Sequence, residues 1–140
     1  MEYKRFGSKV VIRLDAGDEI IASITDVCVK EDISSGIIQG IGATEELRTR
    51  IYDKASDTFV FKDLTGSREI TSLTGNITMT AEDELFIHTH ITTADKEMNI
   101  TGGHLMSCIV SVTSEIFLDI LDGTVNRYPS EGGLFGRLKL

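Results

Sequence analysis

The sequence predicts an α+β fold, with one main helix packed on a largely antiparallel sheet of about seven or eight strands. Most segments are short, β-branched and bounded by turn residues, which is typical of strands. Only residues 19–30 carry apolar side chains at helical spacing. Thirteen glycines against one proline suit many tight turns. Because strands cluster around a single helix instead of alternating with helices, we expect an α+β arrangement in one domain, residues 1–140.

Residues 9–14 (KVVIRL) form the first predicted strand, and the helix follows after a turn at Gly17. Asp18 is the expected N-cap, because its carboxylate can accept a hydrogen bond from a free amide of the first turn. The apolar stripe of the helix consists of Ile20, Ile21, Ile24, Val27 and Cys28. This stripe predicts a helix that covers one face of the sheet.

The middle of the chain predicts four more strands, which are residues 35–41, 47–52, 58–62 and 68–79. The second and third of them are expected to pair as a hairpin around residues 53–57. Gly75 lies inside the fourth strand, where a glycine indicates a bulge or the close approach of another backbone. The strands predicted after these are a histidine-containing segment from Leu85, residues 105–113, residues 115–121 and the tail, residues 134–140.

All three histidines lie between residues 85 and 106. The segment from Leu85 alternates, so His88 and His90 share one strand face at roughly 7 Å, close enough for two imidazoles to reach one ion. His104 follows a polar turn and two glycines, so a returning element can bring it to the same face. A single histidine on a strand is usually an ordinary packed or exposed residue. The clustering of all three favours a divalent metal site, most simply Zn²⁺ with an open fourth position, although imidazoles also suit Ni²⁺, Fe²⁺ or Cu²⁺.

The net charge of −8 disfavours nucleic-acid binding, because phosphate backbones are bound chiefly by Lys and Arg. The basic residues near the two ends of the chain are expected to be solvated. No apolar run reaches the length of a membrane span and no signal peptide begins the chain, so we expect no membrane partner and a cytoplasmic location. Cys28 and Cys108 lie in apolar contexts and are expected to be buried free thiols.

Four segments, taken in order and spacing, resemble the PPC (plants and prokaryotes conserved) domain family in its stand-alone prokaryotic form. They are RLDAGDEI at 13–20, GIGA at 40–43, REITSLTGNI at 68–77 and HTHITTADKEMNITGGHL at 88–105. The resemblance implies an α+β fold and a homotrimer. The His-x-His and Gly-Gly-His motifs of prokaryotic members fall on His88, His90, Gly102, Gly103 and His104.

Plant relatives pair this domain with an AT-hook, a short basic Arg-Gly-Arg-Pro motif that enters the minor groove. This chain has no such motif, and its one proline is Pro129. DNA therefore stays a possible partner without its known physical basis.

The sequence leaves three functions open. The first is a non-catalytic, metal-binding oligomer with a regulatory role, with association with DNA as one option. The second is a metal-dependent enzyme acting on a small molecule, which needs a general acid or base near the ion; Glu69 is the candidate, and the catalytic residues stay unassigned. The third is a structural trimer with a histidine-lined interface. Side chains that could support the metal ligands are Glu69, Ser72, Thr74 and Asn76.

Overall fold

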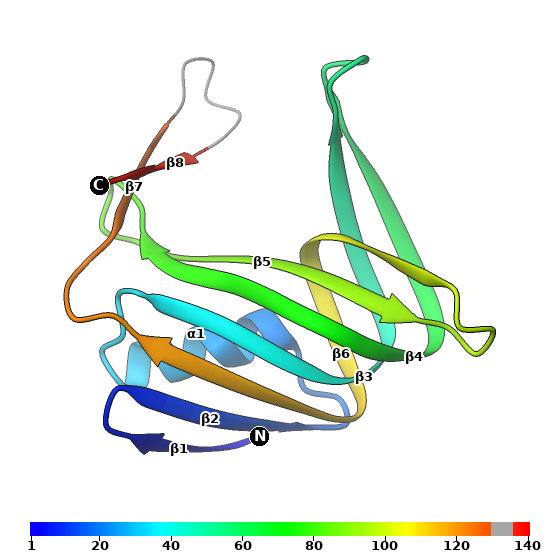
Figure 1. The fold of residues 1–140 in the computed structure, drawn as a ribbon, viewed down its shortest axis with the longest axis horizontal. Helices are drawn as coiled ribbons and strands as arrows, with labels where there is room; N and C mark the ends of the chain where they lie inside the picture. Colours follow the sequence, from blue (N-terminus) through cyan, green and yellow to red (C-terminus); the bar gives the residue numbers. More distant parts are fainter. Residues whose placement is uncertain (130–135) are drawn as a thin grey trace.

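A computed structural model of the chain describes residues 1–129 and 136–140. Within them, one helix packs on a mostly antiparallel sheet of eight strands, which confirms the predicted fold class (Figure 1). The elements are β1 (Glu2–Phe6), β2 (Lys9–Asp15), α1 (Ile20–Lys30), β3 (Gly36–Asp53), β4 (Thr58–Met79), β5 (Leu85–Ala94), β6 (Ile100–Ile120), β7 (Asn126–Pro129) and β8 (Gly136–Lys139). In this part of the chain no helix is long and apolar enough to cross a membrane.

The sheet closes on itself through β5, the strand that carries His88 and His90. The strands follow the order β1-β2-β6-β3-β4-β7-β8, and β5 pairs with both β4 and β6. Because β3 also pairs with β4 and β6, the strands β3, β4, β5 and β6 form a closed ring of antiparallel pairs. Figure 1 shows the outer ends of β3 and β4 rising as a two-stranded arm at one end of β5, with β7 and β8 at the other.

Three of the strands are much longer than the sequence predicted. The segments 35–41 and 47–52 are one strand, β3, and the same is true of the predicted pairs in β4 and β6. Register shifts at Gly40/Gly42 and Thr44/Glu46 bend β3 without ending it. A bulge adds an unpaired residue and turns the strand while the pairing continues, so one strand can extend through positions where the sequence predicted two.

The edge strand β1 was not predicted, because its residues are mostly charged and exposed. At the other end of the chain, the predicted last strand is present as β8 from Gly136 onward. The two residues that precede it in the prediction, 134–135, lie outside the described part of the chain.

The helix begins one residue later than its predicted cap implied, because Glu19 and not Asp18 is the N-cap. One carboxylate oxygen of Glu19 accepts the amide of Ala22 at 2.6 Å, and the other accepts the amide of Cys108 on β6 at 2.9 Å. Asp18 instead accepts the amide of Asp15. The contact with β6 favours Glu19, and this contact cannot be read from local sequence.

The core lies between α1 and one face of the sheet. The residues predicted for the helix stripe are buried, except that Ile21 is only partly covered. They pack with apolar residues of β2, β3, β4, β5 and β6 in one cluster. Cys28 and Cys108 are buried free thiols, as predicted. Burial raises the pKa of Cys28 to about 12 and that of Cys108 to about 11, so neither is a nucleophile at neutral pH.

Candidate metal centre

The strand β5 directs one face to the core and presents its histidines on the other. Ile91 is buried in the core cluster and Ile87 is partly buried against it. Phe86, His88 and His90 alternate with these residues and line a cavity on the opposite side of the strand. The predicted division of this strand into two faces is therefore correct.

The third histidine arrives at the start of β6. His104 is the direct partner of His90 in the pairing of β5 with β6, and the direct partner of Arg50 in the pairing of β3 with β6. Cross-strand partners lie on the same face of an antiparallel pair. The expectation that a returning element brings His104 to the other two histidines is thus met by the register of β6.

Glycines allow this close approach on both edges of β5. A Cβ at Gly102 would lie 2.1 Å from the carbonyl oxygen of Ile91, and a Cβ at Gly75 of β4 would lie 2.1 Å from that of His88. Both distances are far shorter than any real contact, so only glycine fits. The sequence signal at Gly75 is explained by close contact and not by a bulge, since the register shift between β4 and β5 lies at Ile70/Ser72.

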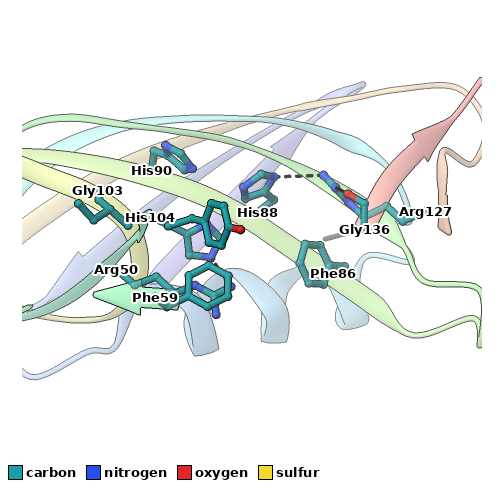
Figure 2. A pocket seen from close by; sticks show the side chains of 11 residues that line it. Arg50, Phe59, Phe86, His88, His90, Gly103, His104, Arg127 and Gly136 are labelled. Atoms are coloured by element: carbon teal, nitrogen blue, oxygen red, sulfur yellow. Dashed lines mark hydrogen bonds between the residues drawn. The ribbon is translucent and has the colours of Figure 1, made fainter. Parts of the chain in front are cut away.

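The three imidazoles form a compact triangle (Figure 2). The ring centroids of His88 and His90 are 5.3 Å apart, those of His88 and His104 5.0 Å, and those of His90 and His104 5.4 Å. One ring nitrogen from each histidine lies within 4.8 Å of those of the other two. Two nitrogens on one tetrahedral Zn²⁺ are about 3.3 Å apart, so small side-chain rotations would bring all three onto one ion.

The surroundings keep two of the imidazoles neutral. Burial, followed by the charge of Arg50 and the two neighbouring histidines, lowers the pKa of His104 to about 4. Burial, followed by the charge of Arg127, also lowers the pKa of His88. A metal ion needs the unprotonated ring, so these side chains are ready to bind at neutral pH without losing a proton. The donor set therefore fits a divalent transition metal.

The cavity beside the histidines has a volume of about 620 Å³. It is lined by Arg50, Ile51, Tyr52, Phe59, Phe86, His88, His90, Gly103, His104, Arg127 and Gly136. The walls come from the arm of β3 and β4, from β5, from β6 and from the β7–β8 hairpin. Among the described residues, the lining contains no carboxylate. The site combines three imidazoles, two guanidinium groups and aromatic rings.

Arg127 is 9% exposed and is held by neutral groups. Its Nε donates to the hydroxyl of Thr78 at 2.8 Å, its Nη1 to the carbonyl of Gly136 at 3.0 Å, and its Nη2 to the side-chain oxygen of Asn76 at 2.8 Å. Nη2 also lies 3.2 Å from Nδ1 of His88, drawn as a dashed line in Figure 2. Burial lowers the pKa of this guanidinium.

Arg50 occupies the other side of the cluster. Its guanidinium stacks 4.4 Å from the centre of the Phe59 ring, and its Nη2 lies 3.4 Å from Nε2 of His104. Its Nε is buried and has no hydrogen-bond partner among the described residues. Figure 2 shows Arg50 and Phe59 on the His104 side of the site, and Phe86 and Arg127 on the side of His88.

Comparison with known proteins gives the family. A sequence model of the Plants and Prokaryotes Conserved (PCC) domain matches residues 1–122. The chain belongs to this family. The resemblance found in the sequence is thereby confirmed, since PCC and PPC name the same domain. Comparison of this PCC domain with curated protein sequences found no match.

Solved structures similar to this PCC domain cover nearly its whole length. A protein from Bacteroides thetaiotaomicron named "putative DNA-binding protein" is 28% identical, with a TM-score of 0.93 over 99% of this chain and 96% of that one. A metal-containing protein from Archaeoglobus fulgidus is 26% identical, with a TM-score of 0.84 over 99% and 97%. A plant- and prokaryote-conserved protein from Pyrococcus horikoshii is 28% identical, with a TM-score of 0.82 over 99% and 96%.

The other residues that the sequence offered for the site lie at different distances along β4 from the histidines. Asn76 is opposite His88 and binds Arg127, so it reaches the histidines through that arginine. Thr74 is opposite His90, but Ser72 is opposite Thr92. Glu69 pairs with Ala94 at the far end of β5 and does not line the cavity, so the structure does not bring this candidate acid or base to the histidines.

Sequence reasoning missed the two arginines of the cavity. Arg50 lies in a predicted hairpin and Arg127 in a glycine-rich tail, far from the histidines along the chain. The rings of Tyr52 and Phe59 pack on each other with centroids 5.6 Å apart, and both also line the cavity. The only signal for Arg50 was a long basic side chain next to an aromatic pair, which does not predict a site by itself.

Proposed function

We propose that this PCC domain is a metal-dependent binding module for a small molecule. In this proposal His88, His90 and His104 hold one divalent ion, most simply Zn²⁺, and the remaining coordination position faces the cavity. The observation that carries it is the meeting of three imidazoles, with ring nitrogens within 4.8 Å, at the wall of a cavity of about 620 Å³. Cavities of this size hold small organic ligands, and an ion with three protein ligands has room for one more.

Two further observations support the proposal. The relative from Archaeoglobus fulgidus is described as metal-containing. In addition, the low pKa of His104, about 4, keeps its ring unprotonated at neutral pH, as metal binding requires. The chemistry of three imidazoles favours Zn²⁺, Ni²⁺, Fe²⁺ or Cu²⁺ over Mg²⁺ or Ca²⁺, which prefer oxygen ligands.

A metal-dependent enzyme acting on a small molecule is the second candidate. It is favoured by the cavity beside the proposed ion, because a bound divalent metal can polarise a carbonyl or lower the pKa of a bound water. It is disfavoured by the lining, which offers no carboxylate as a general acid or base in the described residues. The binding role therefore fits the side chains better than acid–base catalysis does.

We also propose that the domain is a homotrimer with a regulatory role. The family resemblance implies the trimer, and the exposed apolar side chains of Ile37, Ile41 and Phe117 on the sheet are suited to self-association. A similar structure is named "putative DNA-binding protein", but a net charge of −8 makes direct DNA binding by this chain unfavourable. Light scattering coupled to size exclusion tests the trimer, and a gel shift on random-sequence DNA at low salt tests DNA binding.

The metal site is tested by titrating metal-free protein with Zn²⁺ in a calorimeter and by measuring metal content after dialysis. We expect one ion per chain, and a loss of at least a hundredfold in affinity for His88→Ala, His90→Ala and His104→Ala. Thr92→Ala is the matched control, because Thr92 lies on the same strand and face two residues beyond His90. Unchanged metal content in all three histidine variants would refute the proposal.

A further inference from the structure

Arg50 and Arg127 line the cavity on either side of the histidines, and neither forms an ion pair with a carboxylate within residues 1–129 and 136–140. The other arginines with ion pairs in this part of the chain show the usual arrangement: Arg48, for example, pairs with Asp63 at 3.6 Å. Two cationic side chains therefore face one cavity that has no anionic side chain among its described lining residues. Such a cavity attracts negative charge.

Arg127 is placed there at an energetic cost. It is 9% exposed, and the acceptors around it are a hydroxyl, a carbonyl, a side-chain amide and an imidazole. A buried charge that meets only neutral partners is less stable than one with an opposite charge beside it. The geometry of these four contacts also fixes the guanidinium in one orientation, so it is preorganised for an incoming group.

Metal binding would leave both arginines short of an acceptor. A neutral imidazole has one nitrogen with a free lone pair, and an arginine can only donate. The contacts of Arg127 with His88 and of Arg50 with His104 therefore use the same lone pairs that a metal ion would take. When the ion binds through one ring nitrogen, the other carries hydrogen and cannot accept. One N–H of each guanidinium then has no acceptor beside the ion. Within the part of the chain that the structure describes, Nε of Arg50 lacks a partner even before the ion binds.

Aromatic rings also line the cavity. Phe59 lies against Arg50 at 4.4 Å, and Phe86 lies against Arg127 at 5.0 Å. Tyr52 adds a third ring, and its hydroxyl donates to Asp57. A guanidinium over a ring keeps N–H groups that can donate to a ligand, and its planar fork matches the two oxygens of a carboxylate. The rings themselves suit an apolar body.

We propose that the cavity binds a small organic carboxylate with an apolar or aromatic body, whose carboxylate pairs with Arg50 and Arg127 beside the metal ion. This inference rests on the proposed function, because the ion is what releases the arginine donors. An oxygen next to the carboxylate, such as the hydroxyl of a 2-hydroxy acid, would complete the coordination of the ion. The apolar body would lie between the rings of Phe59 and Phe86.

The probe is mandelate, which has a carboxylate, an adjacent hydroxyl and a phenyl ring, and its neutral counterpart is mandelamide. Both are titrated calorimetrically into zinc-loaded protein freed of excess zinc. We expect mandelate to bind at least tenfold more tightly than mandelamide, because hydrogen bonds between two charged groups are the strong ones. We expect Arg50→Gln to weaken mandelate binding about tenfold or more while metal content stays at one ion per chain.

Arg48→Gln is the matched control for Arg50→Gln. Arg48 lies two residues earlier on β3 and also stacks on a ring, that of Phe61 at 5.2 Å, but it does not line the cavity. Its replacement should leave mandelate binding unchanged. The carboxylate inference is overturned, and the metal site stands, if mandelate and mandelamide bind equally well. The same holds if Arg50→Gln and Arg48→Gln lose equal affinity for mandelate. Absence of metal binding in the unmodified protein overturns both proposals.

Discussion

Replacing Gly102 with alanine is expected to destabilise the fold and weaken the metal site together. Gly102 lies on β6 opposite Thr92 of β5, and an added Cβ would lie 2.1 Å from the carbonyl oxygen of Ile91. The closest comfortable distance between such atoms is about 3.3 Å, so the two strands must separate by roughly 1 Å. This movement acts directly on the pairing of His90 with His104, two residues further along β6.

The size of the effect follows from that separation. A shift of about 1 Å stretches backbone hydrogen bonds from roughly 2.9 Å beyond the normal limit, and losing two of them costs about 1–3 kcal/mol. Residual strain in the packed strands adds about 1–3 kcal/mol. Alanine loses less backbone entropy than glycine on folding, and this difference offsets about 0.5–1 kcal/mol of the destabilisation. We therefore expect the free energy of unfolding to fall by about 1–5 kcal/mol.

The assay is urea denaturation of metal-free protein at one fixed protein concentration, followed by zinc titration under native conditions. Gly136→Ala is the control, because its nearest atoms would lie 3.6 Å from the new Cβ, an ordinary contact, although Gly136 also lines the cavity. Its free energy of unfolding should change by about 0.5 kcal/mol or less. Equal stability and equal zinc affinity for Gly102→Ala and unmodified protein would refute the argument from close strand approach.

Two other predictions concern acid sensitivity and the helix cap. In metal-free protein the free energy of unfolding should fall from pH 6.5 toward 4, because burial and then Arg50 lower the pKa of folded His104 to about 4, so the unfolded chain binds more protons there. Urea denaturation at pH 7 and 4.5 should show a larger drop for unmodified protein than for His104→Gln, and equal drops would contradict this. Glu19→Ala should lower the free energy of unfolding by about 1–2 kcal/mol, since it removes both the cap and the acceptor for the Cys108 amide. Thermal denaturation should show a smaller loss for Asp18→Ala, and the reverse order would restore Asp18 as the cap.

The part of the candidate site that lies on one strand, β5, was predictable from the sequence. His88 and His90 share a face because side chains alternate along any strand, whatever its neighbours. The glycines before His104 indicated a close approach, and the structure shows which backbone each glycine meets. Glu69 failed as a candidate for the opposite reason, since its distance from the histidines depends on the register between β4 and β5.

The arginines show the limit of local reasoning most directly. Arg50 is placed by the pairing of β3 with β6, and Arg127 by hydrogen bonds to side chains of β4. These contacts join residues about 50 positions apart in the chain, and Arg50 and His104, for example, are 54 positions apart. Nothing in the composition or alternation around either arginine encodes such a partner.

The sequence by itself determined the α+β class, the amphipathic helix, the two faces of β5 and the three candidate metal ligands, because each depends on local periodicity and on residue chemistry. The tertiary structure decided which strands continue through bulges, which residue caps the helix, and which side chains surround the histidines. These features depend on strand register and on contacts between distant segments. Such contacts form only when the closed ring of β3, β4, β5 and β6 has been assembled.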